Sequence, residues 1–229
     1  MFHMFQSFAA TFERSWPFLT QGFQITIESW IISIVLGMAI GLVACLMKIS
    51  NWKILNLISN FYIWLIRGTP MLVQALVVYF GCPQVIPGFH PTPFLAGIIT
   101  LSLNAGAYLS EIFRSGIQAV PKGQTEAARS LGLSAGRTTV KIVLPQAIKI
   151  AVPPMVNQFI ITLKDTSILT VIGLAEIVNK ATQYVNVRYD FFQTYVWVGI
   201  YYLAFTSLLM LLAHYLEKRL SYDRKNRRS

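Results

Sequence analysis

Long apolar stretches separated by short polar and basic segments dominate the chain. A hydrocarbon core about 30 Å thick requires about 20 apolar residues per helix, and this criterion predicts five membrane-spanning helices. They cover residues 23–47, 57–81, 94–113, 146–163 and 191–213. Glycine and proline lie inside or beside several of them, which membrane helices tolerate better than soluble ones. The pattern therefore predicts an all-α, polytopic membrane protein.

Two further segments do not fit an ordinary span. Residues 166–178 are apolar but too few to cross a bilayer, so we expect a re-entrant or half-buried helix there. The first 21 residues lack a basic start and a small-residue cleavage site, and Glu13 and Arg14 interrupt any short apolar core. We therefore expect a retained interfacial segment, not a signal peptide. Residues 1–229 are predicted to form a single transmembrane domain.

Composition excludes most other classes of protein. With 55% hydrophobic and 12% charged residues, the chain cannot have the surface of a soluble globular domain. The two cysteines, Cys45 and Cys82, offer no disulfide framework and no CxxC metal site. His3, His90 and His214 are scattered, and no nucleophile motif is present, so a membrane enzyme is the weakest alternative.

The net charge of +10 is distributed unevenly between the loops. In a five-span arrangement, fourteen basic residues fall on one side: Lys48, Lys53, Arg114, Lys122, Arg129, Arg137, Lys141, Lys149, Lys218, Arg219, Arg224, Lys225, Arg227 and Arg228. Four fall on the other side: Arg14, Lys164, Lys180 and Arg188. This asymmetry predicts an outside N-terminus and a cytoplasmic C-terminus, and it favours five spans over six. A nucleic-acid partner is not expected, because no basic face with groove-reading helices is visible.

One polar, basic segment interrupts the apolar pattern with a fixed spacing of residues. Residues 126–145 read EAARSLGLSAGRTTVKIVLP. The pattern EAA, three residues, Gly, nine residues, Ile-x-Leu-Pro is typical of the cytoplasmic loop of ABC-importer permease subunits. All seven fixed positions match, at Glu126, Ala127, Ala128, Gly132, Ile142, Leu144 and Pro145. The segment therefore resembles that loop.

Local propensities predict the structure of this segment. Pro121 ends what precedes it, and residues 125–131 favour a helix of about two turns that stops at Gly132 and Ser134, with the glycine in a left-handed conformation. The resemblance implies that residues 121–145 form a cytoplasmic coupling loop whose helix docks into an ATP-hydrolysing subunit. The coupling residues would be Glu126, Ala127, Ala128, Arg129, Leu131 and Gly132. The alternative is an ordinary solvated loop helix.

Three shorter runs resemble the polar amino-acid branch of the same family. Glu111 and Arg114 stand at i, i+3 and are expected to pair. The run RGTP at 67–70 predicts a kink in the second span, with Arg67 near its cytoplasmic end or in contact with substrate. The run at 164–167, KDTS, offers a cation and hydroxyls at an irregular segment, where transporters place their sites.

A pocket for an α-amino acid needs hydrogen-bond donors and acceptors together, and a set of polar residues in or beside the spans supplies both. The candidates for the substrate path are Gln74, Ser102, Asn104, Lys164, Thr166 and Ser167. The same side chains are equally suited to hold helices together inside a membrane. The sequence leaves both roles open.

Taken together, these motifs resemble the permease subunit of an ABC importer for polar amino acids of the histidine, glutamine, arginine and cystine type. The resemblance implies a multi-pass protein of the bacterial cytoplasmic (inner) membrane that translocates its substrate by alternating access. It also implies two ABC ATPase subunits, a second permease copy or a homologous permease, and an extracytoplasmic solute-binding protein as partners. The amino acid itself is not identified.

The chain has no GxxxxGK[ST] phosphate loop, so ATP and Mg are expected on the ATPase subunits, with no enzyme activity or cofactor in this chain. An ATP-independent secondary transporter or channel remains the rival interpretation. Such a protein would have paired repeats and ion-coupled intramembrane carboxylates, and the sequence contains no convincing internal repeat.

Overall fold

The computed structural model describes the backbone of residues 2–225 and the side chains of residues 8–219, and it contains only helices and connections within that range. Arg227 and Arg228, part of the predicted basic tail, lie outside the described residues. The elements are α1 (Phe2–Ile49), α2 (Lys53–Gly68), α3 (Met71–Leu76), η1 (Val77–Gly81), α4 (Cys82–Val85), α5 (Pro93–Gln118), α6 (Lys122–Ser130), α7 (Ala135–Thr138), η2 (Thr139–Val143), α8 (Leu144–Asp165), η3 (Thr166–Ile172), α9 (Ile177–Arg188) and α10 (Phe191–Lys225).

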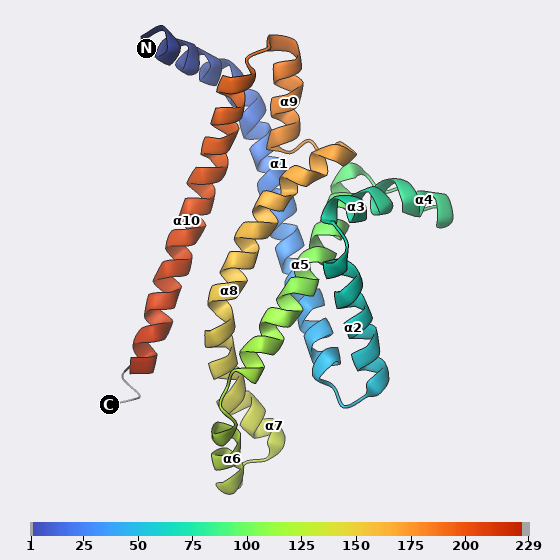
Figure 1. The fold of residues 1–229 in the computed structure, drawn as a ribbon, viewed down its shortest axis with the longest axis vertical. Coiled ribbons are helices and arrows are strands. Elements are labelled where there is room, and N and C mark those ends of the chain that lie inside the picture. Colours follow the sequence, from blue (N-terminus) through green and yellow to red (C-terminus); the bar gives the residue numbers. More distant parts are fainter. Residues whose placement is uncertain (1, 226–229) are drawn as a thin grey trace.

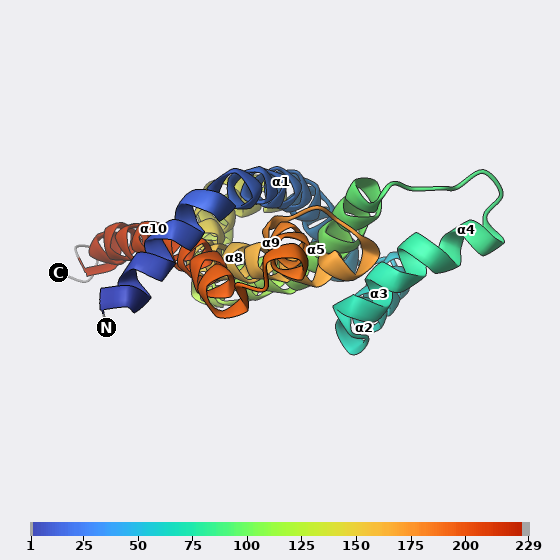
Figure 2. The same ribbon diagram turned by 90° about the horizontal axis from the view of Figure 1, so that it is seen from above.

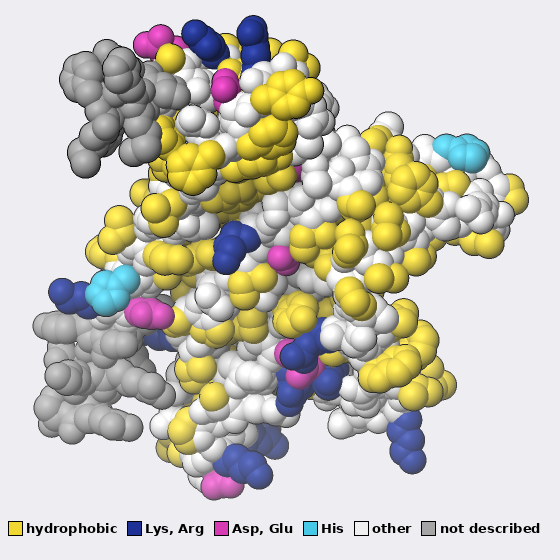
Figure 3. Space-filling view, turned by 45° about the horizontal axis from the view of Figure 1, so that its top comes forward, with side chains coloured by type: hydrophobic (Ala, Val, Ile, Leu, Met, Phe, Trp, Pro, Cys, Tyr) yellow, Lys and Arg dark blue, Asp and Glu magenta, His cyan; other side chains and the backbone are white. Residues whose placement is uncertain are grey.

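Long helices run roughly along one direction and define two ends of the molecule (Figure 1). The turn between α1 and α2 and the segment 119–143 lie at one end, which we name the loop end. The beginning of α1 and all of α9 lie at the other end, which we name the α9 end. In Figure 3, hydrophobic side chains are spread over much of the visible face, and Lys and Arg lie in its upper and lower parts, with some near its middle. That distribution suits a protein embedded in a bilayer.

The prediction of an all-α protein with about five spans is confirmed. Within the described residues, four helical stretches are long and apolar enough to cross a membrane: Phe8–Ile49, Pro93–Gln118, Ala135–Ile172 and Phe191–Arg219. The pair Lys53–Gly68 and Met71–Val85 makes a fifth crossing if the two are counted as one broken span. Of the four long stretches, Pro93–Gln118 is the most buried, so α5 is the central helix of the fold.

From the sequence we expected an N-terminal interfacial segment separate from the first span. In the structure this segment and the first span form one continuous helix. α1 is one helix of 48 residues that passes through Pro17. At about 1.5 Å per residue it is roughly 70 Å long, more than twice the hydrocarbon thickness. Its first turns are fixed on α10 by aromatic contacts, with ring centroids 4.3 Å apart for Phe12 and Trp197. Trp197 Nε1 also donates to the carbonyl of Phe8 at 3.2 Å.

Small residues bring α1 and α5 close together. Gly37 and Gly41 stand four residues apart on α1 and face Ala105 and Gly106 of α5. A Cβ at Gly37 would lie 3.0 Å from the Cβ of Ala105, and one at Gly41 would lie 2.9 Å from the carbonyl oxygen of Gly106. This is the small-xxx-small packing that membrane helices use in place of a hydrophobic driving force. The crossing sets the frame on which the remaining helices are placed.

The predicted kink in the second span is confirmed. The span is in fact broken into two helical stretches at a sharp bend. α2 ends at Gly68, Thr69 is extended, and the following helical stretch Met71–Val85 is bent by 105° from α2. Gln74 Nε2 bridges the break by donating to the carbonyls of Ile66 at 2.7 Å and Thr69 at 3.0 Å. From above, α3 and α4 project as an arm away from the other helices (Figure 2).

Of the two predictions for Arg67, the position near the cytoplasmic end of the span does not agree with the orientation predicted from the charges. The α1–α2 turn is predicted to be cytoplasmic. Arg67 lies at the opposite end of α2, away from this turn. Its guanidinium stands 5.0 Å from the ring centroid of Tyr108 on α5. The reason is that α2 begins at Lys53 and places Arg67 four turns along the helix, about 20 Å from the turn.

The structure of residues 166–178 also differs from the single short helix expected from the sequence. They form the 3₁₀ helix η3, which ends where Gly173 adopts a positive φ of 82°, and they then lead into α9. Glu176 starts α9, with its carboxylate accepting the backbone N–H of Asn179 at 2.7 Å and of Val178 at 2.9 Å. α9 was not predicted. Its apolar side packs on α1 and α10 through a buried cluster that includes Leu19, Ile177 and Val198.

Candidate functional site: the coupling loop and the α8–α10 groove

The helix α6 occupies the matched motif at the loop end. It runs from Lys122 to Ser130, so it begins three residues before the predicted start. Pro121 precedes it in an extended conformation, and the Pro121 carbonyl accepts the N–H of Gln124 at 3.0 Å. No side chain caps the first turn of this helix. The helix therefore depends on its C-terminal end for local stability.

That end is closed by a Schellman motif. Gly132 has a φ of 82°, the N–H of Leu133 reaches the carbonyl of Ala128 at 3.1 Å, and the N–H of Gly132 reaches the carbonyl of Arg129 at 3.0 Å. Arg129 Nη1 also donates to the carbonyl of Leu133 at 2.9 Å. The left-handed glycine stop predicted from the sequence is therefore confirmed.

The surface of α6 is almost entirely free. Ala128 is the residue of α6 that the subunit buries, at 6% exposure. Glu126, Ala127 and Arg129 are exposed, and Leu131, at the tip, is 81% exposed. An apolar tip beside an acid and a guanidinium, on a helix with few internal contacts, is suited to a groove on another protein.

The loop joins the rest of the subunit through α8. α7 and η2 follow one another into α8 without a turn, so a continuous helix extends from Ala135 to Asp165. This helix crosses α5 closely, because a Cβ at Gly116 would lie 2.9 Å from the carbonyl oxygen of Ala147 and 3.0 Å from the Cβ of Ala151. The loop is therefore connected to α8 by unbroken helix and, through this close contact, to α5.

The expected Glu111–Arg114 pair is present and includes a third member. Arg114 Nη2 lies 2.7 Å from one carboxylate oxygen of Glu111, and Lys48 Nζ of α1 lies 2.8 Å from the other. The carboxylate is half-buried, which makes this pairing stronger than that of two exposed side chains. The cluster ties α1 to α5 near the loop end.

An open groove of about 400 Å³ lies between α8 and α10 and receives two of the predicted path residues. Its lining consists of Ile160, Lys164, Ser167, Gly199, Tyr202, Leu203, Thr206 and Met210. Ser167 Oγ donates to the carbonyl of Lys164 at 2.7 Å. Sequence reasoning missed Tyr202 and Thr206, although two hydroxyl residues at i, i+4 in an apolar span were a visible signal.

Thr166 lies behind this groove and not in it. It is fully buried, and its hydroxyl donates to the carbonyl of Leu163 at 2.7 Å and lies 3.4 Å from the Tyr202 hydroxyl. Tyr202 in turn donates to Glu176 Oε2 at 3.4 Å. Glu176 lies outside the candidate spans, and its burial raises its pKa to about 7. Thr166, Tyr202 and Glu176 thus link η3, α10 and the start of α9.

The other three predicted path residues lie elsewhere. Asn104 Nδ2 of α5 donates to Gln74 Oε1 at 3.4 Å, so these two carboxamides meet next to the break between α2 and α3. Ser102 is buried, and its hydroxyl has no partner in the described part of the chain. The structure therefore brings together Gln74 with Asn104, and Lys164 with Ser167, without joining all six residues in one pocket.

No metal centre is visible among the described side chains. Between residues 8 and 219, no three His, Cys, Asp or Glu side chains are close enough together to hold an ion. The cysteines in that range, Cys45 and Cys82, are both free thiols.

Comparison with known proteins gives consistent similarities along nearly the whole chain. The family described as "Binding-protein-dependent transport system inner membrane component" matches residues 33–222. The arginine transport system permease protein ArtQ of Bacillus subtilis is 38% identical over 93% of this chain and 96% of its own length. The putative glutamine transport system permease protein GlnP of Rickettsia conorii is 35% identical over 89% of this chain and 93% of its own.

A solved structure agrees with the fold. The crystal structure of an amino acid ABC transporter with histidines contains a chain that superposes with a TM-score of 0.87 at 37% identity. That match covers 92% of this chain and 97% of the other. The fold and the sequence similarity therefore extend over the same residues.

Proposed function

The chain belongs to the family of binding-protein-dependent transport system inner membrane components, and from that membership we propose that it is the permease subunit of an ATP-driven importer of a polar amino acid. The two similar permeases belong to transport systems for arginine and glutamine, which supports a polar amino acid as the substrate class. The geometry of α6 is the observation that carries the proposal. An exposed, glycine-stopped helix on a continuous helical connection is a part that a second protein must complete.

We infer the partners from the family and from the lack of a GxxxxGK[ST] phosphate loop in this chain. Two ABC ATPase subunits bind ATP and Mg and hold the α6 helices. A second permease, either a copy of this chain or a homologous chain, provides the other half of the path. An extracytoplasmic solute-binding protein delivers the amino acid. Glu126, Ala127, Ala128, Arg129, Leu131 and Gly132 of this chain form the contact with the ATPase subunit.

The proposed mechanism is alternating access driven from the loop end. Closure of the ATPase subunits moves α6, and the helix from Ala135 to Asp165 carries this movement past the Gly116 crossing to η3. Binding energy at one site thereby shifts the balance between two arrangements of the spans. The chain itself catalyses no reaction in this mechanism.

The α8–α10 groove and the Gln74–Asn104 pair are the proposed contacts along the substrate path. Lys164 supplies a cation for the substrate carboxylate, and the hydroxyls of Ser167, Tyr202 and Thr206 supply further hydrogen bonds. Gln74 and Asn104 supply carboxamides that bond either a carboxylate or an ammonium. Ser102 and Thr166 support the helices beside these positions.

We further propose that the loop end faces the cytoplasm and that the N-terminus lies outside, in the inner membrane of a bacterium. The basic residues at the loop end support this orientation. The test is labelling of single cysteines with an impermeant thiol reagent, after Cys45 and Cys82 are replaced by serine. Val187→Cys should react in intact cells and Ser134→Cys only after permeabilisation, since both positions are exposed. The reverse order would overturn the orientation.

The function is tested by co-purification and uptake. The full chain, expressed with its candidate ATPase subunit and binding protein, should retain the ATPase subunit and should import a labelled amino acid into vesicles only with ATP. Inactivating the ATPase subunit by mutation should abolish this uptake. Uptake that follows an ion gradient without ATP would instead establish the secondary-transporter alternative.

A further inference from the structure

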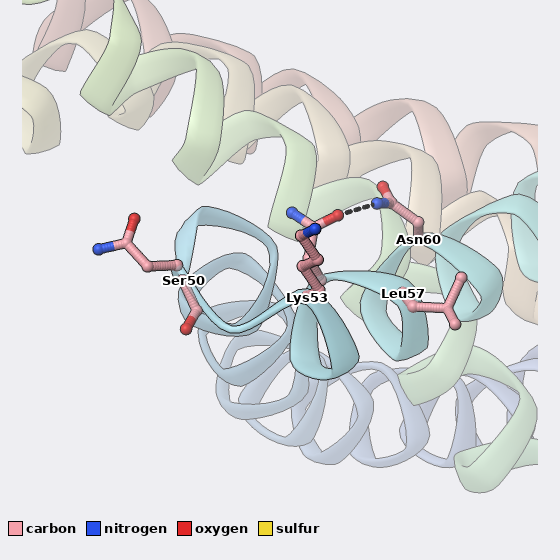
Figure 4. A pocket seen from close by; sticks show the side chains of 6 residues that line it. Ser50, Lys53, Leu57 and Asn60 are labelled. Atoms are coloured by element: carbon pink, nitrogen blue, oxygen red, sulfur yellow. Dashed lines mark hydrogen bonds between the residues drawn. The ribbon is translucent and has the colours of Figure 1, made fainter.

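A second cavity lies at the loop end, away from α6 and from the α8–α10 groove. It has a volume of about 420 Å³ and is lined by Ser50, Asn51, Lys53, Asn56, Leu57 and Asn60. Figure 4 shows Lys53, Leu57 and Asn60 of α2 and Ser50 of the α1–α2 turn around it. Neither the coupling role of α6 nor the proposed substrate path uses these residues.

The lining is rich in hydrogen-bonding groups and carries a positive charge. Lys53 is exposed and forms no ion pair within the described side chains, and the lining contains no acidic residue. Asn60 Nδ2 donates to Asn56 Oδ1 at 2.6 Å, and Asn56 Nδ2 donates to the Lys48 carbonyl at 2.6 Å. These bonds fix the two asparagines along one side of α2. Glu111 pairs with Lys48 and Arg114 and forms no ion pair with Lys53.

The polar cavity opens onto an apolar helix face. Leu57, itself part of the lining, is exposed, and so are Ile54, Phe61 and Trp64 along α2. Their spacing of three to four residues aligns them on one side of the helix, leading from the cavity towards the middle of the predicted span. Trp52 is also exposed, at the α1–α2 turn, where membrane proteins concentrate tryptophan at the headgroup level.

We propose that this surface binds an anionic phospholipid, with its phosphate and headgroup in the cavity and its acyl chains along the apolar face of α2. A phosphodiester complements the uncompensated charge of Lys53. A hydroxyl-bearing headgroup such as glycerol matches carboxamides that both donate and accept. A free phosphate would leave the apolar face uncovered.

The bound lipid stabilises the hairpin of α1 and α2. Ser59 Oγ already donates to the Ala44 carbonyl at 2.7 Å within this hairpin. A headgroup held between the α1–α2 turn and Asn60 adds a bridge further towards the loop end. The stability of the α1–α2 hairpin is therefore predicted to depend on how much anionic phospholipid the leaflet at this end contains.

The proposal is tested by native mass spectrometry of the purified full-length chain with any subunit that accompanies it. The chain is titrated with dioleoyl phosphatidylglycerol and, separately, with dioleoyl phosphatidylcholine. Wild-type protein should retain phosphatidylglycerol preferentially. Lys53→Gln should lower that retention about fivefold, the effect expected for one cation at an anionic surface. Lys53→Arg should keep the preference, and Lys141→Gln, at an exposed lysine of the same end, is the matched control.

Further arms distinguish a lipid from a free anion and from a protein partner. Phe61→Ser should weaken retention of the two-chain lipid, and inorganic phosphate at millimolar concentration should not displace it. Equal retention of both lipids by wild type, an equal loss in Lys141→Gln, or complete displacement by phosphate would each overturn the proposal. Disulfide cross-linking of Trp64→Cys to the same position of a second copy, in membranes, would overturn it in favour of a permease contact.

Discussion

Two short helices, α6 at the loop end and α9 at the opposite end, are held in different ways. α6 buries Ala128 alone within this subunit and has no side-chain cap at its start, so its stability depends on the glycine at its end. α9 buries four of its residues and is capped by the carboxylate of Glu176, which is itself fully buried. α9 is therefore fixed by its own chain, whereas α6 leaves most of its surface free, as expected of a helix that we propose docks into an ATPase subunit.

The largest effect is expected where α9 meets α1. A Cβ at Gly22 would lie 2.7 Å from the Cα of Ile177 and 3.0 Å from the carbonyl oxygen of Glu176, and backbone atoms cannot move aside as a flexible side chain can. Gly22→Leu should therefore separate α9 from α1, with a loss of several kcal/mol in stability. The measurement is the yield of monodisperse protein in detergent. Gly199→Leu, at a glycine with open space around it, is the control and should keep its yield. Normal yield of Gly22→Leu would contradict the close contact.

The next effect concerns the end of α6. Gly132 has a positive φ with nothing within reach of an added Cβ, so valine there is strained by the backbone conformation and not by crowding. Gly132→Val should lower ATP-driven uptake at least about tenfold while membrane insertion and thermal stability stay normal. Gly123→Val is the matched control, because Gly123 also has open space but lies in ordinary helix. Equal uptake by the two variants would show that coupling does not depend on the Schellman motif.

Reversing one charge on α6 should have a smaller effect. Glu126 is exposed within the free subunit, so Glu126→Lys disturbs a contact with the partner without disturbing the fold. We expect association with the ATPase subunit to weaken about fivefold to tenfold, as for the loss of one charge-assisted contact. Glu217→Lys adds the same charge at another exposed position and should bind normally. Equal weakening in both would indicate a general charge effect in place of a specific contact.

At the α9 end, the stability of the cap should depend on pH. Burial raises the pKa of Glu176 to about 7, above the ordinary 4.5, so the folded state favours the neutral carboxyl group. The stabilisation is fully present below about pH 4.5 and is lost as pH rises through 7, by on the order of 3 kcal/mol. The melting temperature of wild-type protein should therefore fall from pH 5 to pH 8. Glu176→Gln should flatten this dependence and Glu13→Gln, at an exposed acid, should not. An unchanged slope in Glu176→Gln would exclude Glu176 as its source.

The smallest effects are expected for the two adjacent hydroxyl residues of η3, Thr166 and Ser167. Ser167 lines the groove and Thr166 lies behind it, so their alanine variants should differ in kind. Ser167→Ala should lower uptake two- to threefold with normal stability, whereas Thr166→Ala should lower the free energy of unfolding by about 1 kcal/mol. Uptake and thermal melting measured on the same preparations compare the two. Normal uptake with Ser167→Ala would remove this hydroxyl from the substrate path.

The comparison also explains what could be predicted from the sequence. α6 was predicted because its signals are local: a proline before it, good helix formers, and a glycine at the position of the left-handed residue. α9 was missed because the prediction relied on the length of apolar runs, and α9 is short and mixed in composition. Its signal was present, however. Glu176 is an acidic cap, and Ile177, Ala181, Tyr184 and Val185 repeat at helical spacing on one face.

The substrate-path candidates show the limit of sequence reasoning. Polar residue types inside spans identified Lys164 and Ser167, and the structure adds Tyr202 and Thr206 opposite them. Which polar side chains share a cavity depends on how helices far apart in sequence are packed. That packing arises from contacts such as those of Gly37 and Gly41, whose effect a hydropathy pattern does not report.

The unbroken helix from Ala135 to Asp165 has a mechanical consequence. The Gly116 contact near Ala147 and Ala151 acts as a fulcrum close to its midpoint, with about 20 Å of helix on either side. A lever with equal arms transmits a displacement without enlarging it, so the swing at the groove is no greater than the swing at the loop. Pro153 and Pro154 lie just beyond the fulcrum, where missing hydrogen bonds make a helix compliant. In the proposed mechanism, we therefore expect part of each movement of the loop to be absorbed by bending of the helix between the prolines and Lys164.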